Sequence, residues 1–164
     1  MNILIYGSKG WIGQQFITLL QKQNIRFIEG TSRVNSIKDI QKEIDSKTPT
    51  HIVSFIGRTH GKIGEKVYTT IDYLEQKDKL CENVQDNLFS PMVLGILCSQ
   101  KNIHYTYLGT GCIFKYDNEH PLIFDKEMNG FTEESLPNFF GSSYSIDKRC
   151  QLLGHNQLLN VLEC

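Results

Sequence analysis

The stretch "NILIYGSKGWIG" occupies residues 2–13 and predicts a strand followed by a turn. The mostly apolar residues 2–6 indicate a buried strand. Gly7, Gly10 and Gly13 then form a G-x-x-G-x-x-G pattern. Between a strand and a helix, such glycines allow a tight turn, a close approach of the backbone to a pyrophosphate, and close helix–strand packing. We therefore predict a nucleotide-binding loop, and a plain tight turn is the alternative. The loop residues expected at the nucleotide are Gly7, Ser8, Lys9, Gly10, Trp11, Ile12 and Gly13.

Beyond this loop, predicted helices alternate with predicted strands. Apolar residues at helical spacing predict helices over residues 11–23, 36–46, 71–100 and 142–157. Short apolar runs predict further strands over residues 25–29, 51–56, 103–108 and 159–164. The polar stretches 57–69 and 114–140 are predicted to be mostly loop. This order is typical of an α/β fold, namely a Rossmann-like, doubly wound parallel sheet with helices on both faces.

The predicted last strand runs to the end of the sequence. A domain rarely ends with such a strand unfollowed. We therefore expect residues 1–164 to form one nucleotide-binding domain, the N-terminal part of a longer protein. A small substrate-binding domain is expected beyond residue 164.

The composition is that of a soluble globular protein, and we expect a cytoplasmic location. Of 164 residues, 40% are apolar and 21% are charged, and the formal net charge is −1. No large basic field favours nucleic acid or an anionic membrane as a partner. No apolar run reaches the roughly 20 residues that span a bilayer, and the N-terminus lacks the basic region of a signal peptide. An odd number of cysteines without C-x-x-C disfavours a disulfide framework or a metal site.

The end of the second strand, "EGTSR" at residues 29–33, bears on the choice of cofactor. An acid here, such as Glu29, would bond the ribose 2′-OH of NADH, whereas an arginine would accept the 2′-phosphate of NADPH. Thr31, Ser32 and Arg33 form a predicted phosphate pocket, because Arg33 offers a planar fork of donors. We expect NADPH, with NADH as a second option, and a solvated turn is the structural alternative.

The third strand ends in Phe55-Ile56-Gly57. Ligands of open α/β sheets bind at the carboxyl ends of strands, so these residues are expected to flank the cofactor ribose. The alternative is that these residues only connect the strand to the following loop.

A Y-x-x-x-K pattern lies on the last predicted helix, at Tyr144 and Lys148. Residues four apart share one helix face. An ammonium beside a phenol lowers the phenol pKa, and the phenol can then donate a proton to a carbonyl as hydride arrives. Lys148 is also expected to hold the nicotinamide ribose. The alternative is an exposed helix pair.

Together these motifs resemble the extended short-chain dehydrogenases/reductases over essentially the whole chain. That family pairs Tyr and Lys with a Ser or Thr at the end of the preceding strand, which is Thr110 here. The resemblance also implies that Asn87, in "VQDNLFSP", helps to organise the site beside the cofactor. Its alternative is an ordinary polar helix residue.

The stretch "GTGCIF", residues 109–114, discriminates between chemistries within this family. Dehydratases carry an Asp-Glu pair after the catalytic threonine, and this chain has Gly111 and Cys112 instead. Cys112 matches the cysteine of epimerase-reductases, where a thiol moves the protons next to a ketone. We therefore disfavour dehydration and expect Thr110, Cys112, Tyr144 and Lys148 to be catalytic. A buried thiol at the strand end is the alternative for Cys112.

The longer match "GTGCIFKYDNEHPL…GFTEESLPNFFGSSYSIDK" resembles the UDP-4-keto-6-deoxyglucose 3,5-epimerase/4-reductase modules of rhamnose synthases. This resemblance implies an NADP-dependent enzyme that makes UDP-L-rhamnose, with a second epimerisation group beyond residue 164. One departure is "SFIGRTHG", where relatives have an N-A-A-G-like turn. Alternatives are a plain reductase of dTDP-4-dehydrorhamnose, an epimerase-reductase of another nucleotide sugar, and a non-catalytic NADP-binding regulatory subunit. A homodimer through the helices 71–100 and 142–157 is an expectation by analogy.

Overall fold

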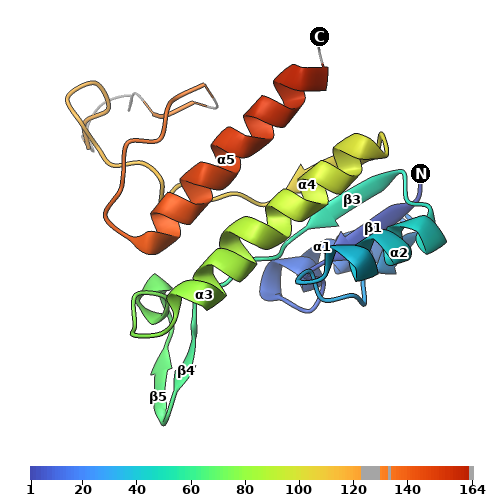
Figure 1. The fold of residues 1–164 in the computed structure, drawn as a ribbon, viewed down its shortest axis with the longest axis horizontal. Helices are drawn as coiled ribbons and strands as arrows, with labels where there is room; N and C mark the ends of the chain where they lie inside the picture. Colours follow the sequence, from blue (N-terminus) through green and yellow to red (C-terminus); the bar gives the residue numbers. More distant parts are fainter. Residues whose placement is uncertain (123–129, 133, 163–164) are drawn as a thin grey trace.

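A parallel sheet forms the centre of the computed structural model, which describes residues 1–122, 130–132 and 134–162, with side chains through residue 154 (Figure 1). Its strand order is β2-β1-β3-β6. The strands are β1 (Ile3–Tyr6), β2 (Phe27–Glu29), β3 (His51–Ser54) and β6 (His104–Tyr107). Tyr6 pairs with Ser54, and Ser54 pairs with Tyr107, so β1, β3 and β6 end at one edge. This carboxyl edge is where open α/β sheets bind ligands.

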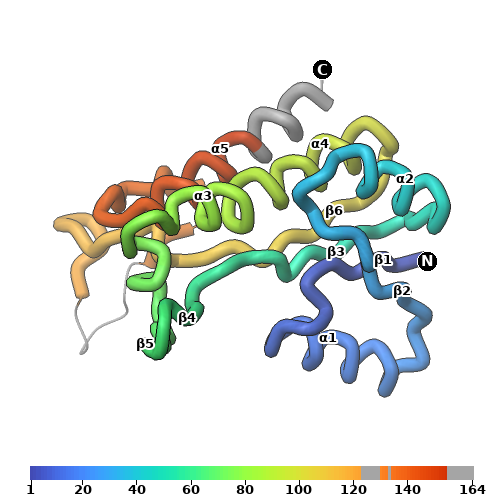
Figure 2. Tube along the Cα trace, turned by 60° about the horizontal axis from the view of Figure 1, so that its bottom comes forward, coloured from blue at the N-terminus to red at the C-terminus, as the bar shows by residue number. Residues whose placement is uncertain are grey.

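Helices cover both faces of the sheet. They include α1 (Trp11–Lys22), α2 (Ile37–Lys47) and α4 (Ser90–Gln100). Figure 2 shows α1 on one side of the strands and α2 with α4 on the other. Because side chains alternate along a strand, Ile3 and Ile5 of β1 pack against α1, while Leu4 and Tyr6 face α2 and α4. The doubly wound α/β fold predicted from the sequence is confirmed.

The predicted strand 159–164 is wrong over the residues described. Helix α5 (Ser143–Leu162) begins where the Y-x-x-x-K helix was expected and continues through residue 162, alongside α4 (Figure 1). Residues 163–164 lie outside the described part. A short apolar run cannot be assigned to strand or helix by its periodicity, and no proline separates it from the helix before it.

The loop prediction for residues 57–69 is also incomplete, because a hairpin projects from the body here (Figure 1). It consists of β4 (Gly61–Ile63) and β5 (Lys66–Tyr68), paired antiparallel. Gly64, with φ +59°, takes the first position of the two-residue turn. Glycine there is a known hairpin signal.

The predicted helical region 71–100 is divided in the structure. Its parts before α4 are the short 3₁₀ turn η1 (Ile71–Tyr73), α3 (Leu80–Asn83) and the π-helical segment η2 (Val84–Phe89). Segments of π-helix are rare and often occur at functional sites. Within the described residues, no helix combines the length and hydrophobicity needed to cross a membrane.

Candidate active site

The glycine loop joins β1 to α1 with the geometry that its sequence predicts. Gly7 has φ +74°, and a Cβ there would lie 2.7 Å from the carbonyl carbon of Phe55. Gly10 donates its N–H to the Gly7 carbonyl at 3.1 Å and caps α1. A Cβ on Gly13 would lie 2.5 Å from the Gly7 oxygen. The glycines therefore make the tight turn and the close helix–strand contact, and the N-terminus of α1 faces the carboxyl edge of the sheet.

Gly13→Ala is expected to lower the free energy of unfolding by about 1–3 kcal/mol, the usual cost of overpacking. The added methyl group would meet backbone atoms of Gly7 and Ser8 that cannot turn aside. Urea denaturation measures the change. Gly111→Ala is the matched control, because a Cβ at Gly111 meets nothing within 4 Å. Equal stability of the two variants would contradict the packing role of Gly13.

One groove of about 260 Å³ connects the glycine loop with the Y-x-x-x-K pair. Its lining includes Gly10, Trp11, Ile12, Gly13, Phe55, Ile56, Gly57, Tyr144 and Lys148. A Cβ on Gly57 would lie 3.6 Å from the Lys148 Nζ, so the end of β3 approaches α5 closely. The structure thus places three separately predicted segments along a single surface.

Tyr144 is 5% exposed, and the Thr110 side chain lies close enough to its phenol to act on the phenol's pKa. Lys148 lies on the same face of α5, with its Nζ 5.7 Å from the centre of the Tyr144 ring. Burial raises the pKa of Tyr144, although the nearby Thr110 side chain opposes this shift. The sequence predicts a lowered pKa for Tyr144, but in the protein without a bound cofactor this pKa is raised. Burial also lowers the pKa of Lys148 to about 8.

Tyr107, the last residue of β6, was missed by the sequence analysis. The ammonium of Lys148 donates a hydrogen bond to its hydroxyl, and burial raises the pKa of Tyr107. Tyr107 and Thr110 also line a second cavity of about 450 Å³, together with Ile113 and Phe114. The position of Tyr107 at the carboxyl end of a strand is a signal that could have identified it.

Cys112 lies beside the Thr110–Tyr144 pair. Its N–H donates to the Thr110 hydroxyl at 3.2 Å, and the Ser145 hydroxyl donates to its carbonyl at 2.7 Å. The thiol is close enough that a negative charge on it would raise the pKa of Tyr144. Cys112 is a free, exposed cysteine, so the alternative of a buried packing thiol is wrong.

Asn87 is fully buried in η2. Its side chain accepts the N–H of Arg58 and donates to the Arg58 carbonyl, both at 2.9 Å, and it also donates to Asn83 at 2.8 Å. Its amide is thus used to hold the turn after β3, and Gly57 lies directly against it. The structure supports an organising position, while direct contact with a cofactor stays a prediction.

The predicted phosphate pocket has a different set of donors from the one expected. A cavity of about 180 Å³ is lined by Gly30, Ser32 and Arg33, among others. However, the N–H and hydroxyl of Thr31 both donate to Glu43, each at 2.7 Å. Thr31 therefore points its donors into the protein, whereas Arg33 is exposed and Ser32 lines the cavity. Glu29 is exposed at the end of β2.

Within the described residues, no group of three or more His, Cys, Asp or Glu side chains could hold a metal ion.

Several curated proteins match nearly the whole chain. The protein L780 of Acanthamoeba polyphaga mimivirus is 48% identical over 165 residues, which cover 98% of this chain and 54% of L780. A bifunctional dTDP-4-dehydrorhamnose 3,5-epimerase/dTDP-4-dehydrorhamnose reductase of Arabidopsis thaliana is 35% identical over 147 residues, covering 90% of this chain and 45% of that protein. The chain is a homologue of both. The resemblance identified from the sequence is confirmed, and the chain spans about half the length of these relatives. No family model matches.

Solved structures agree with this relationship. The crystal structure of the L780 UDP-rhamnose synthase superposes with a TM-score of 0.85 at 44% identity, over 96% of this chain and 52% of L780. The dTDP-4-dehydrorhamnose reductase of Bacillus anthracis, solved in complex with NADP, has a TM-score of 0.73 at 16% identity, over 96% of this chain and 49% of that one. The second comparison supports the fold alone.

Proposed function

We propose that the protein is an NADPH-dependent 3,5-epimerase/4-reductase that converts UDP-4-keto-6-deoxyglucose into UDP-L-rhamnose. The observation that carries this proposal is the single groove that joins the glycine loop to Tyr144 and Lys148, with Thr110 near the Tyr144 phenol. The homology to L780, described as a UDP-rhamnose synthase, favours a UDP-linked substrate.

The loop has the tight turn of a dinucleotide-binding loop. Gly7 and Gly13 make this turn possible, because a Cβ at either position would collide with neighbouring backbone. The N–H groups at the start of α1 would hold the pyrophosphate, and Phe55–Gly57 would flank the ribose next to the nicotinamide. Lys148 would bond that ribose. Asn87 would keep the turn after β3 in place. When bound, NADPH supplies the hydride for C4 of the sugar.

The chain's own residues would move the protons. Cys112 would remove a proton at C3 or C5, next to the ketone, and a second acid on the opposite face would return a proton, which inverts that carbon. Tyr144 would then donate its proton to the ketone oxygen, with Thr110 holding the phenol in place. Lys148, close to the same ring, would stabilise the phenolate that results.

Product analysis of the full-length protein tests this function. The protein is incubated with NADPH and the UDP-, dTDP- or GDP-linked 4-keto-6-deoxy sugar in separate reactions. UDP-L-rhamnose as the main product is expected. A reduced but non-epimerised sugar would indicate a plain reductase, and another preferred nucleotide would indicate a related epimerase-reductase. Cofactor binding without turnover of any sugar would favour a regulatory subunit.

Arg33→Ala is expected to weaken NADPH binding by about tenfold and NADH binding much less, because it removes a charged donor from the expected 2′-phosphate position. Arg33 is exposed and lines the cavity. Fluorescence titration with each dinucleotide measures both affinities. Lys22→Ala removes a charge from the far end of α1 and serves as the control. Equal losses for the two cofactors would contradict the prediction.

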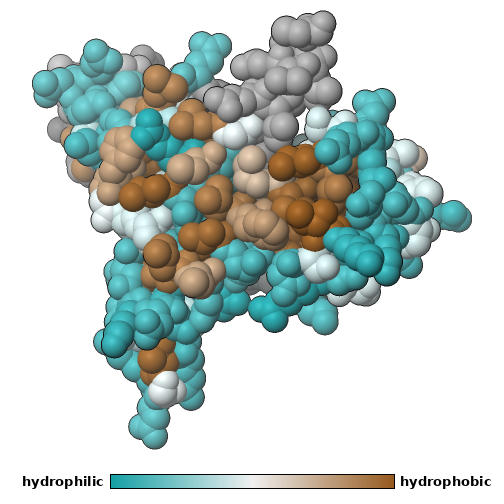
Figure 3. All heavy atoms as spheres, in the orientation of Figure 1, coloured by the Kyte–Doolittle hydropathy of each residue, from teal (hydrophilic) through white to brown (hydrophobic). Residues whose placement is uncertain are grey.

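The remaining expectations stay predictions: a nucleotide-sugar substrate, a substrate-binding domain beyond residue 164, a cytoplasmic location and a homodimer. For the homodimer, Figure 3 shows apolar side chains gathered over α4 and α5, where Ile96 and Ile146 are 37% and 43% exposed. Light scattering of the full-length protein would give its oligomeric state.

A further inference from the structure

A buried carboxylate lies beneath the turn that was expected to bind the 2′-phosphate. Glu43 of α2 is 7% exposed and accepts four hydrogen bonds. The Thr31 N–H and hydroxyl donate to it at 2.7 Å each, and the Ser32 N–H and Tyr6 hydroxyl donate at 3.0 Å. Glu43 thus joins the turn after β2 to α2 and to the end of β1.

The same carboxylate keeps its negative charge. Burial alone would raise the pKa of Glu43, but the bonds from Thr31, Ser32 and Tyr6 outweigh it and lower the pKa to about 2. Among the described residues, no lysine or arginine forms an ion pair with Glu43. An unneutralised charge therefore lies one hydrogen bond from the backbone of Ser32, which lines the cavity.

We propose that Glu43 is a positioning residue that sets the selectivity between NADPH and NADH, an inference that rests on the proposed function. It occupies both backbone N–H groups of Thr31 and Ser32, which in an open turn would be free to bind a phosphate. Arg33 and the Ser32 hydroxyl, which makes only a long bond of 3.5 Å to the Asp39 carbonyl, are left to receive the 2′-phosphate. Its charge also repels that phosphate across the turn, so Glu43 limits the preference for NADPH that Arg33 creates.

Glu43→Gln tests this role by removing the charge at nearly constant shape. The amide oxygen can still accept from Thr31, while its NH₂ cannot accept from Ser32, whose N–H becomes free. We expect the preference for NADPH over NADH, as a ratio of dissociation constants, to rise about five- to tenfold, the size of a screened charge–charge interaction near a surface. Fluorescence titration of the full-length protein with both dinucleotides gives this ratio. An unchanged or lowered ratio would overturn the role.

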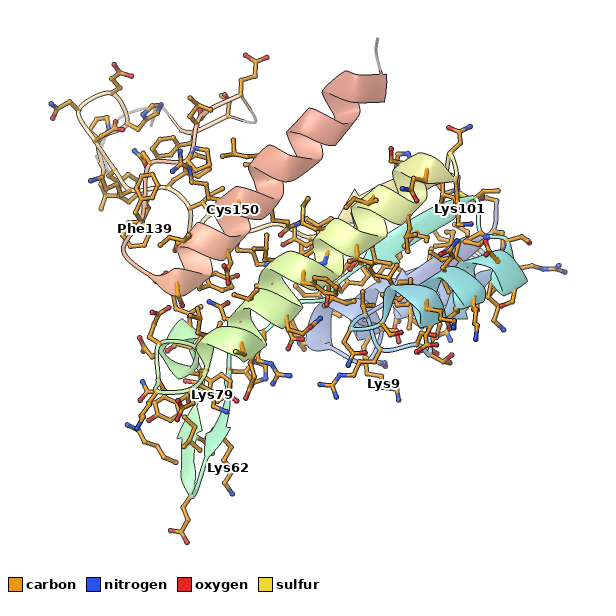
Figure 4. The ribbon with its side chains drawn as sticks, viewed as in Figure 1. Lys9, Lys62, Lys79, Lys101, Phe139 and Cys150 are labelled. Carbon is orange, nitrogen blue, oxygen red and sulfur yellow. The ribbon has the colours of Figure 1, made fainter. Side chains whose placement is uncertain are left out.

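Asp45→Asn is the matched control, because it removes the same charge from the same helix. Asp45 pairs with Lys101, just beyond the C-terminal end of α4, rather than with the turn (Figure 4). The Asp45→Asn protein is expected to show the same preference for NADPH over NADH as the unmodified protein. The same rise in the control would mean that net charge alone sets the ratio, and the role of Glu43 would be excluded.

Thr31→Val supplies a second test that leaves Glu43 in place. If Glu43 holds the Thr31 hydroxyl, removing that hydroxyl lowers stability but leaves the cofactor ratio unchanged. A selective loss of NADPH affinity would show that Thr31 bonds the phosphate, and would overturn the proposal. A protein that binds neither dinucleotide would instead overturn the proposed function, and this role with it.

Discussion

Tyr144→Phe is expected to slow reduction of the ketone by about 10²–10⁴-fold, the usual contribution of a general acid. Phenylalanine keeps the ring that packs in the groove but removes the only proton that Tyr144 can donate. NADPH affinity is expected to change little, because the glycine loop and Lys148 are untouched. Stopped-flow or steady-state measurement of NADPH oxidation gives the rate, and fluorescence titration gives the affinity.

Lys148→Ala is the comparison that separates the two roles. Lys148 is 6% exposed and contacts both Tyr107 and the Tyr144 ring, so its loss is expected to weaken cofactor binding as well as reduction. A Tyr144→Phe protein that reduces the ketone at the original rate would show that the Y-x-x-x-K interpretation is wrong.

Local chemistry explains why much of the fold was predictable. Neighbouring backbone leaves no room for a side chain at Gly7 or Gly13. Glycines at these two positions therefore predict the turn from the sequence. Serine is a residue type that favours the start of a helix, and the Ser36 hydroxyl accepts the Asp39 N–H at the start of α2. Strands β1, β3 and β6 are short apolar runs between such signals. In each case the cause lies within a few residues of its effect.

The features that were missed depend on long-range packing. Glu43 lies in a helix with the ordinary pattern of a polar surface residue, and only the approach of α2 to the end of β2 makes it an anchor for Thr31 and Ser32. Tyr107 becomes part of the site because Lys148, 41 residues later, donates to it. Neither contact leaves a spacing pattern in the sequence.

The pKa of Tyr144 also depends on packing that the sequence pattern does not show. The pair Tyr144 and Lys148 alone predicts a lowered phenol pKa, but burial is the larger effect and raises it. Burial also lowers the pKa of Lys148 to about 8, which still leaves most of its ammonium charged at neutral pH. A bound cofactor's positive nicotinamide ring would favour the phenolate, so we expect the two pKa values to respond to the ligand that fills the groove.

Cys112→Ser is expected to slow proton exchange at C3 or C5 of the sugar by about 10²–10⁴-fold, because a hydroxyl is a far weaker base than a thiol at neutral pH. The exchange is measured as deuterium uptake from heavy water by mass spectrometry, with the full-length protein and without NADPH. The fold should persist, since the thiol is exposed and the bonds that tie residue 112 to Thr110 and Ser145 use its backbone.

Reduction provides the internal control for Cys112→Ser. Hydride transfer to a 4-keto sugar that already has the L-configuration should continue in this variant, because Thr110, Tyr144 and Lys148 remain. A Ser variant that loses both activities equally would indicate damage to the groove rather than loss of a base. Unchanged deuterium uptake would show that Cys112 moves no proton. The 3,5-epimerase part of the proposed function would then need another base, while the reductase part would rest, as before, on Thr110 and the Tyr144–Lys148 pair.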